Sequence, residues 1–253
     1  MKLFYRKFGE GDPIIILHGL LGLSDQWIPV AKKLSFHNYA VYIPDQRDHG
    51  QSGHTNKFNF DVLCSDLLEF IEAHEIINPI IIGHSMGGKI AMHVALNNLT
   101  PIKKLIIVDI GIKQYLPSDF SILDKLTDFD LSSFTKRADI EQSISLFIRK
   151  IPLRKWILKN IRLNAHKTFE WKFNLPLIRQ NAQLIFEEIQ SLKKYTHPIY
   201  FIQGEYSNHL TKQDFPEIKN IFPMASFLTV KNASHWVHVD NEEDFLHSLL
   251  KII

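Results

Sequence analysis

The order of apolar patterns along the first 109 residues limits this chain to few folds. Short apolar runs with the length of β-strands occur at residues 13–17, 39–43, 80–82 and 105–108. Between them, residues 60–74 and 89–99 carry apolar side chains at helical spacing. Because parallel strands are joined by crossover helices, this alternation predicts the α/β class, with a mostly parallel central sheet and helices on both faces.

The N-terminal residues predict a β-hairpin. Residues 3–8 and 13–17 are rich in β-forming side chains, and residues 9–12 (GEGD) separate them. A short connection that contains glycine is typical of the turn between antiparallel strands. We therefore expect the first run to pair with the second.

The alternation stops after Asp109. Residues 112–195 have helical patterns only, and strand patterns return at residues 199–203 and 227–230. Residues 1–111 and 196–253 are therefore predicted to form the core, and residues 112–195 an inserted helical cap.

Composition indicates a globular protein with one large core. The chain has 253 residues, of which 45% are hydrophobic and 22% charged, and its net charge of +2 argues against a nucleic-acid partner. The apolar runs are too short to span a bilayer, the N-terminus lacks a signal-peptide segment, and Cys64 is the only cysteine. We expect a cytoplasmic protein without a membrane span.

Ser85 lies in the segment GHSMGG (residues 83–88), between a predicted strand and a predicted helix. The flanking glycines permit a tight turn that exposes the serine hydroxyl, as in a nucleophile elbow. The following helix directs its positive end at the reacting carbonyl. We predict Ser85 as the nucleophile and the backbone N–H groups of Met86 and Leu20 as oxyanion donors, with His18 shaping the Leu20 loop through hydrogen bonds.

A serine hydroxyl needs a base, and His235 is the best candidate among 13 histidines. It follows the last predicted strand on a short turn before the terminal helix, which gives the required chain order. His238, three residues later, is the rival. His84 is expected to point away from Ser85.

The acid that orients this base has several candidates. Asp109 ends the strand after the nucleophile helix, and neighbouring strand ends lie only about 5 Å apart, so its carboxylate can reach the histidine. Glu205 lies in the loop after the next strand, and Asp214 lies further on. We expect Asp109, with Glu205, Asp214 or a dyad without an acid as alternatives.

With these residues in place, the chain resembles the α/β-hydrolase superfamily and, within it, the small bacterial YbfF-type esterases. The matching segments are LHGLLG (17–22), DQRDHGQS (45–52), GHSMGGK (83–89), VDIG (108–111), WKFNLP (171–176) and SHWVH (234–238). The resemblance implies an α/β-hydrolase fold and hydrolysis of short acyl esters and acyl-CoA thioesters without a cofactor or metal. It also implies an acid at Asp109, whereas the position that many superfamily members use for the acid holds Ser207.

Three of these segments carry further expectations. Asp45, Arg47 and His49 are expected to support their loop through charge-assisted hydrogen bonds. Aromatic side chains at Trp171, Phe173 and Trp236 are the tentative lining of an acyl pocket, with ordinary packing in the cap as the alternative for the first two.

Residues 149–172 form a basic segment, with Glu170 as its only acid and cations at Arg149, Lys150, Arg154, Lys155, Lys159, Arg162, Lys167 and Lys172. A solvated helix face explains such a segment. The alternative is that it attracts an anionic substrate, such as the phosphates of a CoA thioester.

The sequence thus predicts a carboxylic ester or thioester hydrolase that acts on a small molecule with a short to medium acyl chain. Two other functions stay open, because the same scaffold supports them. One is a cofactor-free C–C hydrolase or an elimination enzyme. The other is a binding protein without turnover.

Overall fold

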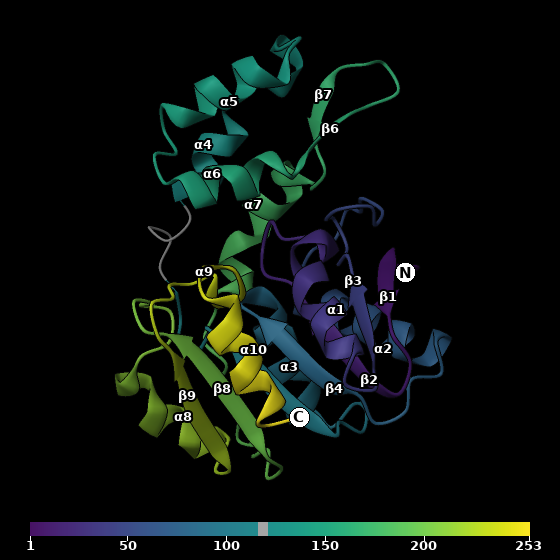
Figure 1. The fold of residues 1–253 in the computed structure, drawn as a ribbon, viewed down its shortest axis with the longest axis vertical. Helices are drawn as coiled ribbons and strands as arrows, with labels where there is room; N and C mark the ends of the chain where they lie inside the picture. Colours follow the sequence, from purple (N-terminus) through teal and green to yellow (C-terminus); the bar gives the residue numbers. More distant parts are fainter. Residues whose placement is uncertain (116–120) are drawn as a thin grey trace.

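The computed structural model describes residues 1–115 and 121–253. Within them, seven strands form one sheet in the order β1-β3-β2-β4-β5-β8-β9, and only β1 runs antiparallel to its neighbour (Figure 1). The strands are β1 (Tyr5–Phe8), β2 (Asp12–Leu17), β3 (Tyr39–Pro44), β4 (Ile80–His84), β5 (Lys104–Val108), β8 (Ile199–Gly204) and β9 (Ala225–Val230). The predicted α/β class with a mostly parallel sheet is confirmed.

Helices cover both faces of the sheet because its central strands are apolar at successive positions. In β2, Ile15 and Leu17 pack into one core while Ile14 and Ile16 pack into another. The first core is shared with α2 (Phe60–Ala73), α3 (Met86–Leu96) and α8 (Phe215–Ile221). The second is shared with the 3-10 turn η1 (Ser24–Trp27), α1 (Ile28–Ser35) and α10 (Glu242–Leu250).

The predicted N-terminal hairpin was wrong. β1 pairs with β3, and β2 lies between β3 and β4 with a parallel partner on each side. The connection passes close to the start of β3, where a Cβ at Gly9 would lie 2.5 Å from the Tyr39 carbonyl oxygen. Glycine therefore serves this close approach rather than a hairpin turn. The apolar β2 lies in the middle of the sheet, where both of its faces are buried.

The chain between β5 and β8 lies above the carboxyl ends of the strands (Figure 1). It contains α4 (Ser121–Thr127), η3 (Leu131–Ser133), α5 (Arg137–Ser145), α6 (Ile151–Leu158), β6 (Ile161–Leu163), β7 (Phe169–Trp171) and α7 (Leu175–Ile185). The prediction that this insertion is purely helical was wrong in one respect, since β6 and β7 form an antiparallel ribbon. Positions 116–120 of the predicted cap lie outside the described residues. We keep the name cap for residues 112–195.

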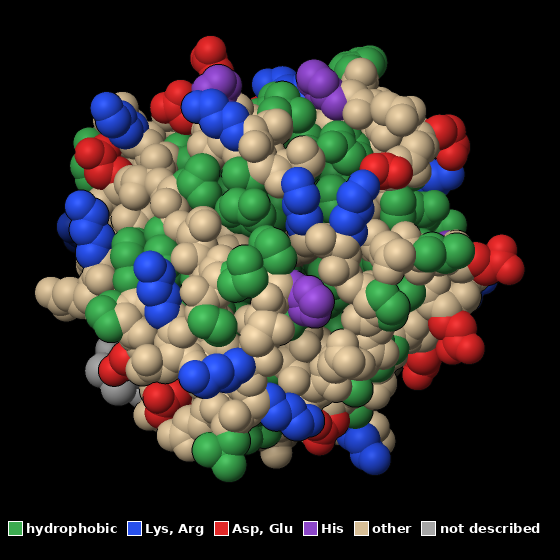
Figure 2. Space-filling model, turned by 90° about the horizontal axis from the view of Figure 1, so that it is seen from below, with side chains coloured by type: hydrophobic (Ala, Val, Ile, Leu, Met, Phe, Trp, Pro, Cys, Tyr) green, Lys and Arg blue, Asp and Glu red, His purple; other side chains and the backbone are tan. Residues whose placement is uncertain are grey.

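The end of the molecule opposite the cap mixes Lys and Arg with Asp and Glu among hydrophobic side chains (Figure 2). This mixture agrees with the small net charge of +2. In the two described stretches, no helix has the length and apolar character needed to cross a membrane.

Candidate active site

Ser85 occupies a sharp turn between β4 and α3. Its φ of 51° lies in the left-handed region, which non-glycine residues rarely adopt. Glycine is required on both sides, because a Cβ at Gly83 would lie 2.4 Å from the Gly87 carbonyl oxygen, and a Cβ at Gly87 would lie 2.4 Å from that of Leu17. The turn places the hydroxyl at the carboxyl edge of the sheet.

The structure brings Ser85, His235 and Asp109 into one hydrogen-bonded chain. Nε2 of His235 lies 3.1 Å from Oγ of Ser85, and its Nδ1 lies 2.8 Å from Oδ2 of Asp109. The three residues follow β4, β9 and β5. The alternative acids have other partners: Glu205 accepts from the Asn232 backbone N–H, and Asp214 forms an ion pair with Lys113.

Asp109 is fully buried at the end of β5. Burial raises the pKa of its carboxyl group to about 6, while hydrogen bonds from the Ser207 hydroxyl and the Gly204 backbone N–H oppose that shift. Ser207, at the position that many superfamily members use for the acid, therefore donates to the Asp109 carboxylate. It supports the carboxylate from the neighbouring strand end.

The surroundings of His235 favour a neutral imidazole ring. Its side chain is 18% exposed, and burial lowers the pKa of the imidazole to about 4, so the ring is neutral at pH 7. Because Asp109 accepts a hydrogen bond, the proton of the neutral ring is placed on Nδ1. Nε2 is then left to accept the Ser85 proton.

The other histidines near Ser85 have structural contacts. His84 donates from Nε2 to the His235 carbonyl oxygen at 2.9 Å, so it binds the backbone of the base and not the nucleophile. His238 is buried and stacks on Trp27 with ring centroids 3.9 Å apart. His238 lines the cavity but is held against Trp27, and the ring bonded to Oγ of Ser85 is that of His235.

Leu20 and Met86 carry the backbone N–H groups that the sequence predicts as oxyanion donors. Met86 is the first residue of α3, so its N–H has no acceptor within the helix, and Leu20 lines the cavity at Ser85. Across the described residues, neither N–H group donates to a protein acceptor. The prediction that they donate to a substrate oxygen is compatible with this lack of a protein acceptor.

The loops beside Leu20 are fixed by buried polar side chains. His18 accepts from the Gln46 backbone N–H at 3.0 Å, and His49 accepts from the Leu21 backbone N–H at 3.0 Å. Burial lowers the pKa of His18 to about 4 and that of His49 to about 3, so both rings are neutral acceptors.

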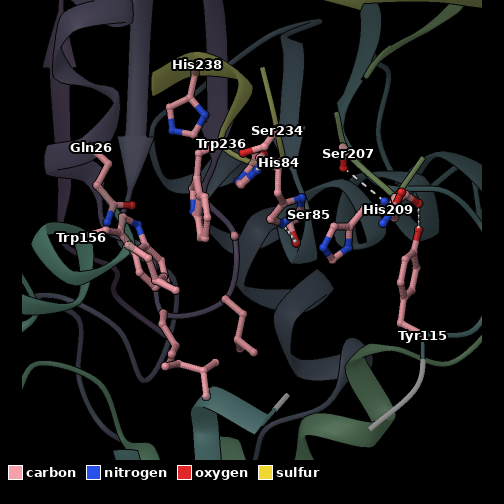
Figure 3. A pocket seen from close by; sticks show the side chains of 18 of the residues that line it. Gln26, His84, Ser85, Tyr115, Trp156, Ser207, His209, Ser234, Trp236 and His238 are labelled. Atoms are coloured by element: carbon pink, nitrogen blue, oxygen red, sulfur yellow. Dashed lines mark hydrogen bonds between the residues drawn. The ribbon is translucent and has the colours of Figure 1, made fainter. Parts of the chain in front are cut away.

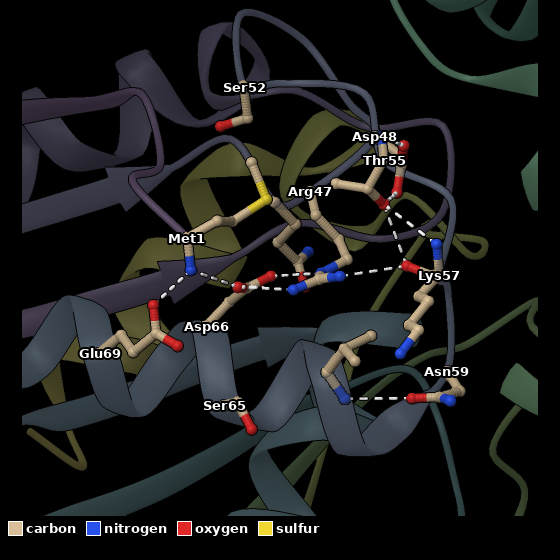
Figure 4. A network of polar contacts seen from close by, with 12 residues as sticks. Met1, Arg47, Asp48, Ser52, Thr55, Lys57, Asn59, Ser65, Asp66 and Glu69 are labelled. Carbon is tan, nitrogen blue, oxygen red and sulfur yellow. Dashed lines mark hydrogen bonds and ion pairs between the residues drawn. The ribbon is translucent and has the colours of Figure 1, made fainter.

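Charged residues complete this support. Asp45 accepts from the Ser24 and Gln51 backbone N–H groups, at 2.6 and 2.9 Å. Arg47 makes two hydrogen bonds to Asp66 of α2 (Figure 4). The expected supporting role of Asp45, Arg47 and His49 agrees with these contacts.

A cavity of about 480 Å³ opens over Ser85 (Figure 3). His235 also lines it. Its apolar wall contains Leu20, Leu21, Tyr115, Ile122, Leu123, Leu153, Trp156, Phe186 and Trp236. Trp236, which the sequence suggested as part of the pocket lining, does line this cavity. Trp171 and Phe173 are absent from the described lining, because their rings stack on each other 5.1 Å apart and Phe173 is buried in the core.

The geometry agrees with a comparison against family models. Residues 12–143, which are more than half of the chain, match the model described as alpha/beta hydrolase fold. The chain belongs to the alpha/beta hydrolase family.

Known relatives of this alpha/beta hydrolase include esterases and lipases. It is 26% identical to esterase YbfF of Escherichia coli, over 96% of this chain and 94% of the esterase. It is 28% identical to the sn-1-specific diacylglycerol lipase ABHD11 of Xenopus laevis, over 96% of this chain and 80% of the lipase. A solved structure named marine microorganism esterase matches with a TM-score of 0.96 and 36% identity, over 100% of this chain and 99% of that one. These relatives support ester hydrolysis.

Sequence reasoning missed several residues of this hydrolase's site. His209 stacks on His235 with ring centroids 3.8 Å apart, and Trp156 of α6 lines the cavity. His209 follows β8 in the same loop as Ser207, so its place after a strand at the carboxyl edge was a usable signal. Trp156 had no such signal, because helical spacing alone does not say which face of a cap helix points at the cavity.

Proposed function

We propose that this chain is a serine hydrolase of carboxylic esters, with Ser85 as nucleophile, His235 as general base and Asp109 as the acid that orients the base. The observation that carries the proposal is the unbroken chain of hydrogen bonds from Asp109 through His235 to Ser85, at 2.8 and 3.1 Å, on the floor of an apolar cavity.

The proposed reaction proceeds through an acyl-enzyme. Ser85 Oγ attacks the ester carbonyl carbon while His235 Nε2 accepts the hydroxyl proton. The N–H groups of Leu20 and Met86 bind the oxyanion that develops. His235 then gives the proton to the departing alcohol, and a water molecule hydrolyses the acyl-enzyme through the same base.

An ester panel with a matched serine control tests this proposal. We expect turnover of p-nitrophenyl esters with short and medium acyl chains, and Ser85→Ala should reduce kcat/KM by at least about 10⁴-fold. A fluorophosphonate should label the wild-type protein but not this variant. Ser65→Ala, which changes an exposed serine of α2, should leave both readouts unchanged.

Each alternative function has its own outcome. Turnover of C–C substrates without ester turnover indicates the C–C hydrolase or elimination enzyme. A protein that neither turns over esters nor reacts with the fluorophosphonate is a binding protein, and this result contradicts the proposal.

Thioesters with an anionic leaving group are a second candidate substrate, supported by the cations beside the cavity. Lys150 lines the cavity at Ser85 and also a second cavity of about 500 Å³, which Lys125 and Arg149 line as well. The two cavities share Ile122 and Leu153. Over the described part of the chain, these three cations form no ion pair. An anionic leaving group such as that of acyl-CoA would meet uncompensated positive charge there.

Salt dependence separates the two substrate classes. If cations bind the leaving group, kcat/KM for an acyl-CoA should fall as salt rises, while that for a p-nitrophenyl ester of the same acyl group stays constant, because salt screens exposed charges. Lys150→Gln should lower only the acyl-CoA value, by about three- to tenfold. Lys155→Gln is the control, since Lys155 lies in α6 but lines neither cavity. Equal salt responses of both substrates exclude thioester steering.

The small-molecule substrate is thus part of this proposal. The cytoplasmic location stays a prediction from the sequence.

A further inference from the structure

Lys89 has a buried ammonium group that the proposed reaction leaves unused. It lies in α3, four residues after Ser85, and is 0% exposed. Its Nζ donates to the backbone carbonyl oxygens of Glu187, Lys113 and Ile112, at 2.6, 3.0 and 3.3 Å. An ammonium group has three N–H donors, so each donor has one acceptor.

These carbonyls belong to the two segments by which the chain enters and leaves the cap. Residues 111–115 lead from β5 into the cap, and residues 186–189 lead out of α7. The segments are also bonded to each other: Tyr115 N–H donates to the Phe186 carbonyl oxygen at 2.9 Å, and Ile189 N–H to that of Ile112 at 2.7 Å. We call the two segments together the stalk. Lys89 fastens both halves of the stalk to the helix that begins at the nucleophile.

The stalk also forms part of the substrate cavity. Tyr115 and Phe186 both line it. The Tyr115 hydroxyl donates to the His209 carbonyl oxygen at 2.6 Å (Figure 3), and the ring of His209 stacks on that of His235. The position of the stalk therefore fixes two cavity walls and is tied to the loop that packs against the base.

The surroundings of Lys89 offset part of the cost of burying its ammonium group. Three carbonyl oxygens converge on Nζ, and the Tyr115 ring centroid lies 5.3 Å away. Burial lowers the pKa of Lys89 to about 7, and the nearby Glu188 and Glu187 oppose that shift. A buried ammonium is costly unless its donors are satisfied, so a role in packing alone would be met more cheaply by an apolar side chain.

We propose that Lys89 is a positioning residue that clamps the stalk to α3 and so sets the shape of the acyl cavity. It determines which acyl chains bind productively, without taking part in the chemistry. This inference rests on the proposed ester hydrolysis.

The test compares Lys89→Gln and Lys89→Met with the wild type on acetyl and octanoyl p-nitrophenyl esters. Because the charge-assisted bonds that hold the cavity walls are lost, we expect KM for the octanoyl ester to rise about tenfold. The kcat for the acetyl ester and the rate of fluorophosphonate labelling should change less than about threefold. Lys104→Gln is the matched control, since Lys104 also donates to a backbone carbonyl, that of Ile252, at the opposite end of the sheet.

Hydrogen exchange gives a second readout that needs no substrate. Amides of residues 111–115 and 186–189 should exchange faster in the two Lys89 variants, while those of β4 and β5 keep their protection. Equal losses of kcat on both esters, or an unchanged KM together with unchanged exchange in the stalk, overturn the proposal. Absence of ester turnover in the wild type contradicts the proposed function instead, and the exchange result still decides whether the clamp exists.

If neither Lys89 variant folds, Tyr115→Phe tests whether the position of the stalk sets the acyl cavity. It removes the hydroxyl bond from the stalk to His209 and the bond to Gly111 within the stalk. The octanoyl KM should again rise selectively. An unchanged KM in this variant overturns the proposal.

Discussion

Ser85 and Asp109 share an unusual backbone, and each follows a buried strand directly. Both have φ of 51°, where the Cβ of an L-residue crowds its own carbonyl. Such residues cost about 1–3 kcal/mol each and persist only where the surroundings hold them. The Ser85 backbone N–H donates to the Val108 carbonyl oxygen and that of Asp109 to the Ile202 carbonyl oxygen, at 3.0 and 2.8 Å. The sheet therefore holds the strained turns that direct both side chains above its carboxyl edge.

Removing the Ser207 hydroxyl should move the acid limb of the pH profile. In Ser207→Ala the Asp109 carboxylate loses a donor that lowers its pKa. Its pKa then rises further above the ordinary value, and the ionised form that holds His235 is lost at higher pH. We expect the acid limb of kcat/KM, which reports the Asp109–His235 pair, to shift upward by about one pH unit.

The measurement is kcat/KM for one soluble ester from pH 4 to pH 9, which extends about two units below the Asp109 pKa of about 6 and about two units above its expected value in the variant. Ser248→Ala, which changes a serine of α10 outside the cavity lining, should leave the profile in place. A limb that stays fixed in Ser207→Ala would mean that this hydroxyl does not stabilise the ionised acid.

Residues in local motifs were predictable from the sequence, and residues placed by tertiary packing were not. Ser85 and Asp109 each follow a readable strand, and His235 follows the last one on a small-residue turn. Tyr115 reaches the site only because its backbone pairs with Phe186, more than 70 residues away. No periodicity in either segment carries that information.

At the scale of elements, α6 brings a different tryptophan to the cavity from the one that the sequence suggested. Trp156 lines the cavity, with its ring centroid 5.8 Å from that of Trp236. Trp171 ends β7 and stacks on Phe173. Trp156 and Trp171 therefore allow a matched comparison, because the same side chain lines the cavity at one position and packs outside it at the other.

Replacing each tryptophan by alanine separates these positions. Trp156→Ala should widen the cavity and lower kcat/KM for a butanoyl ester by about tenfold, because the short chain loses apolar contact. The value for a long acyl ester should change less. Trp171→Ala should leave the ratio of the two esters unchanged, although it lowers the melting temperature. A change of the ratio in Trp171→Ala, but not in Trp156→Ala, would reverse this assignment.

Two features of the strands were not predicted from the sequence: the short strands β6 and β7, and the pairing of β1 with β3. Ile161-Arg162-Leu163 and Phe169-Glu170-Trp171 do alternate apolar and charged side chains, with Arg162 paired to Glu170 across the ribbon. Three residues are too few for this pattern to stand out among helical ones. The β1–β3 pairing was hidden for another reason, since partner choice depends on the whole sheet.

At the scale of the whole molecule, the alternation of patterns was enough to predict the α/β architecture. Each parallel strand needs apolar residues on both faces, which leaves a strong signal. The arrangement of the cap above the sheet leaves a weaker one, because amphipathic helices pack in many orientations.

The pairing of the two stalk segments also bears on how such proteins diversify. The chain leaves the sheet and returns to it at adjacent points, and the two segments are bonded through Tyr115–Phe186 and Ile112–Ile189. The stretch between them is therefore a loop whose ends are already held together. Exchanging that stretch for a foreign one of different length would cost little closure entropy and leave the strand order intact. New substrate preferences are therefore accessible to this scaffold by grafting, without rebuilding the chain of hydrogen bonds that joins Ser85, His235 and Asp109.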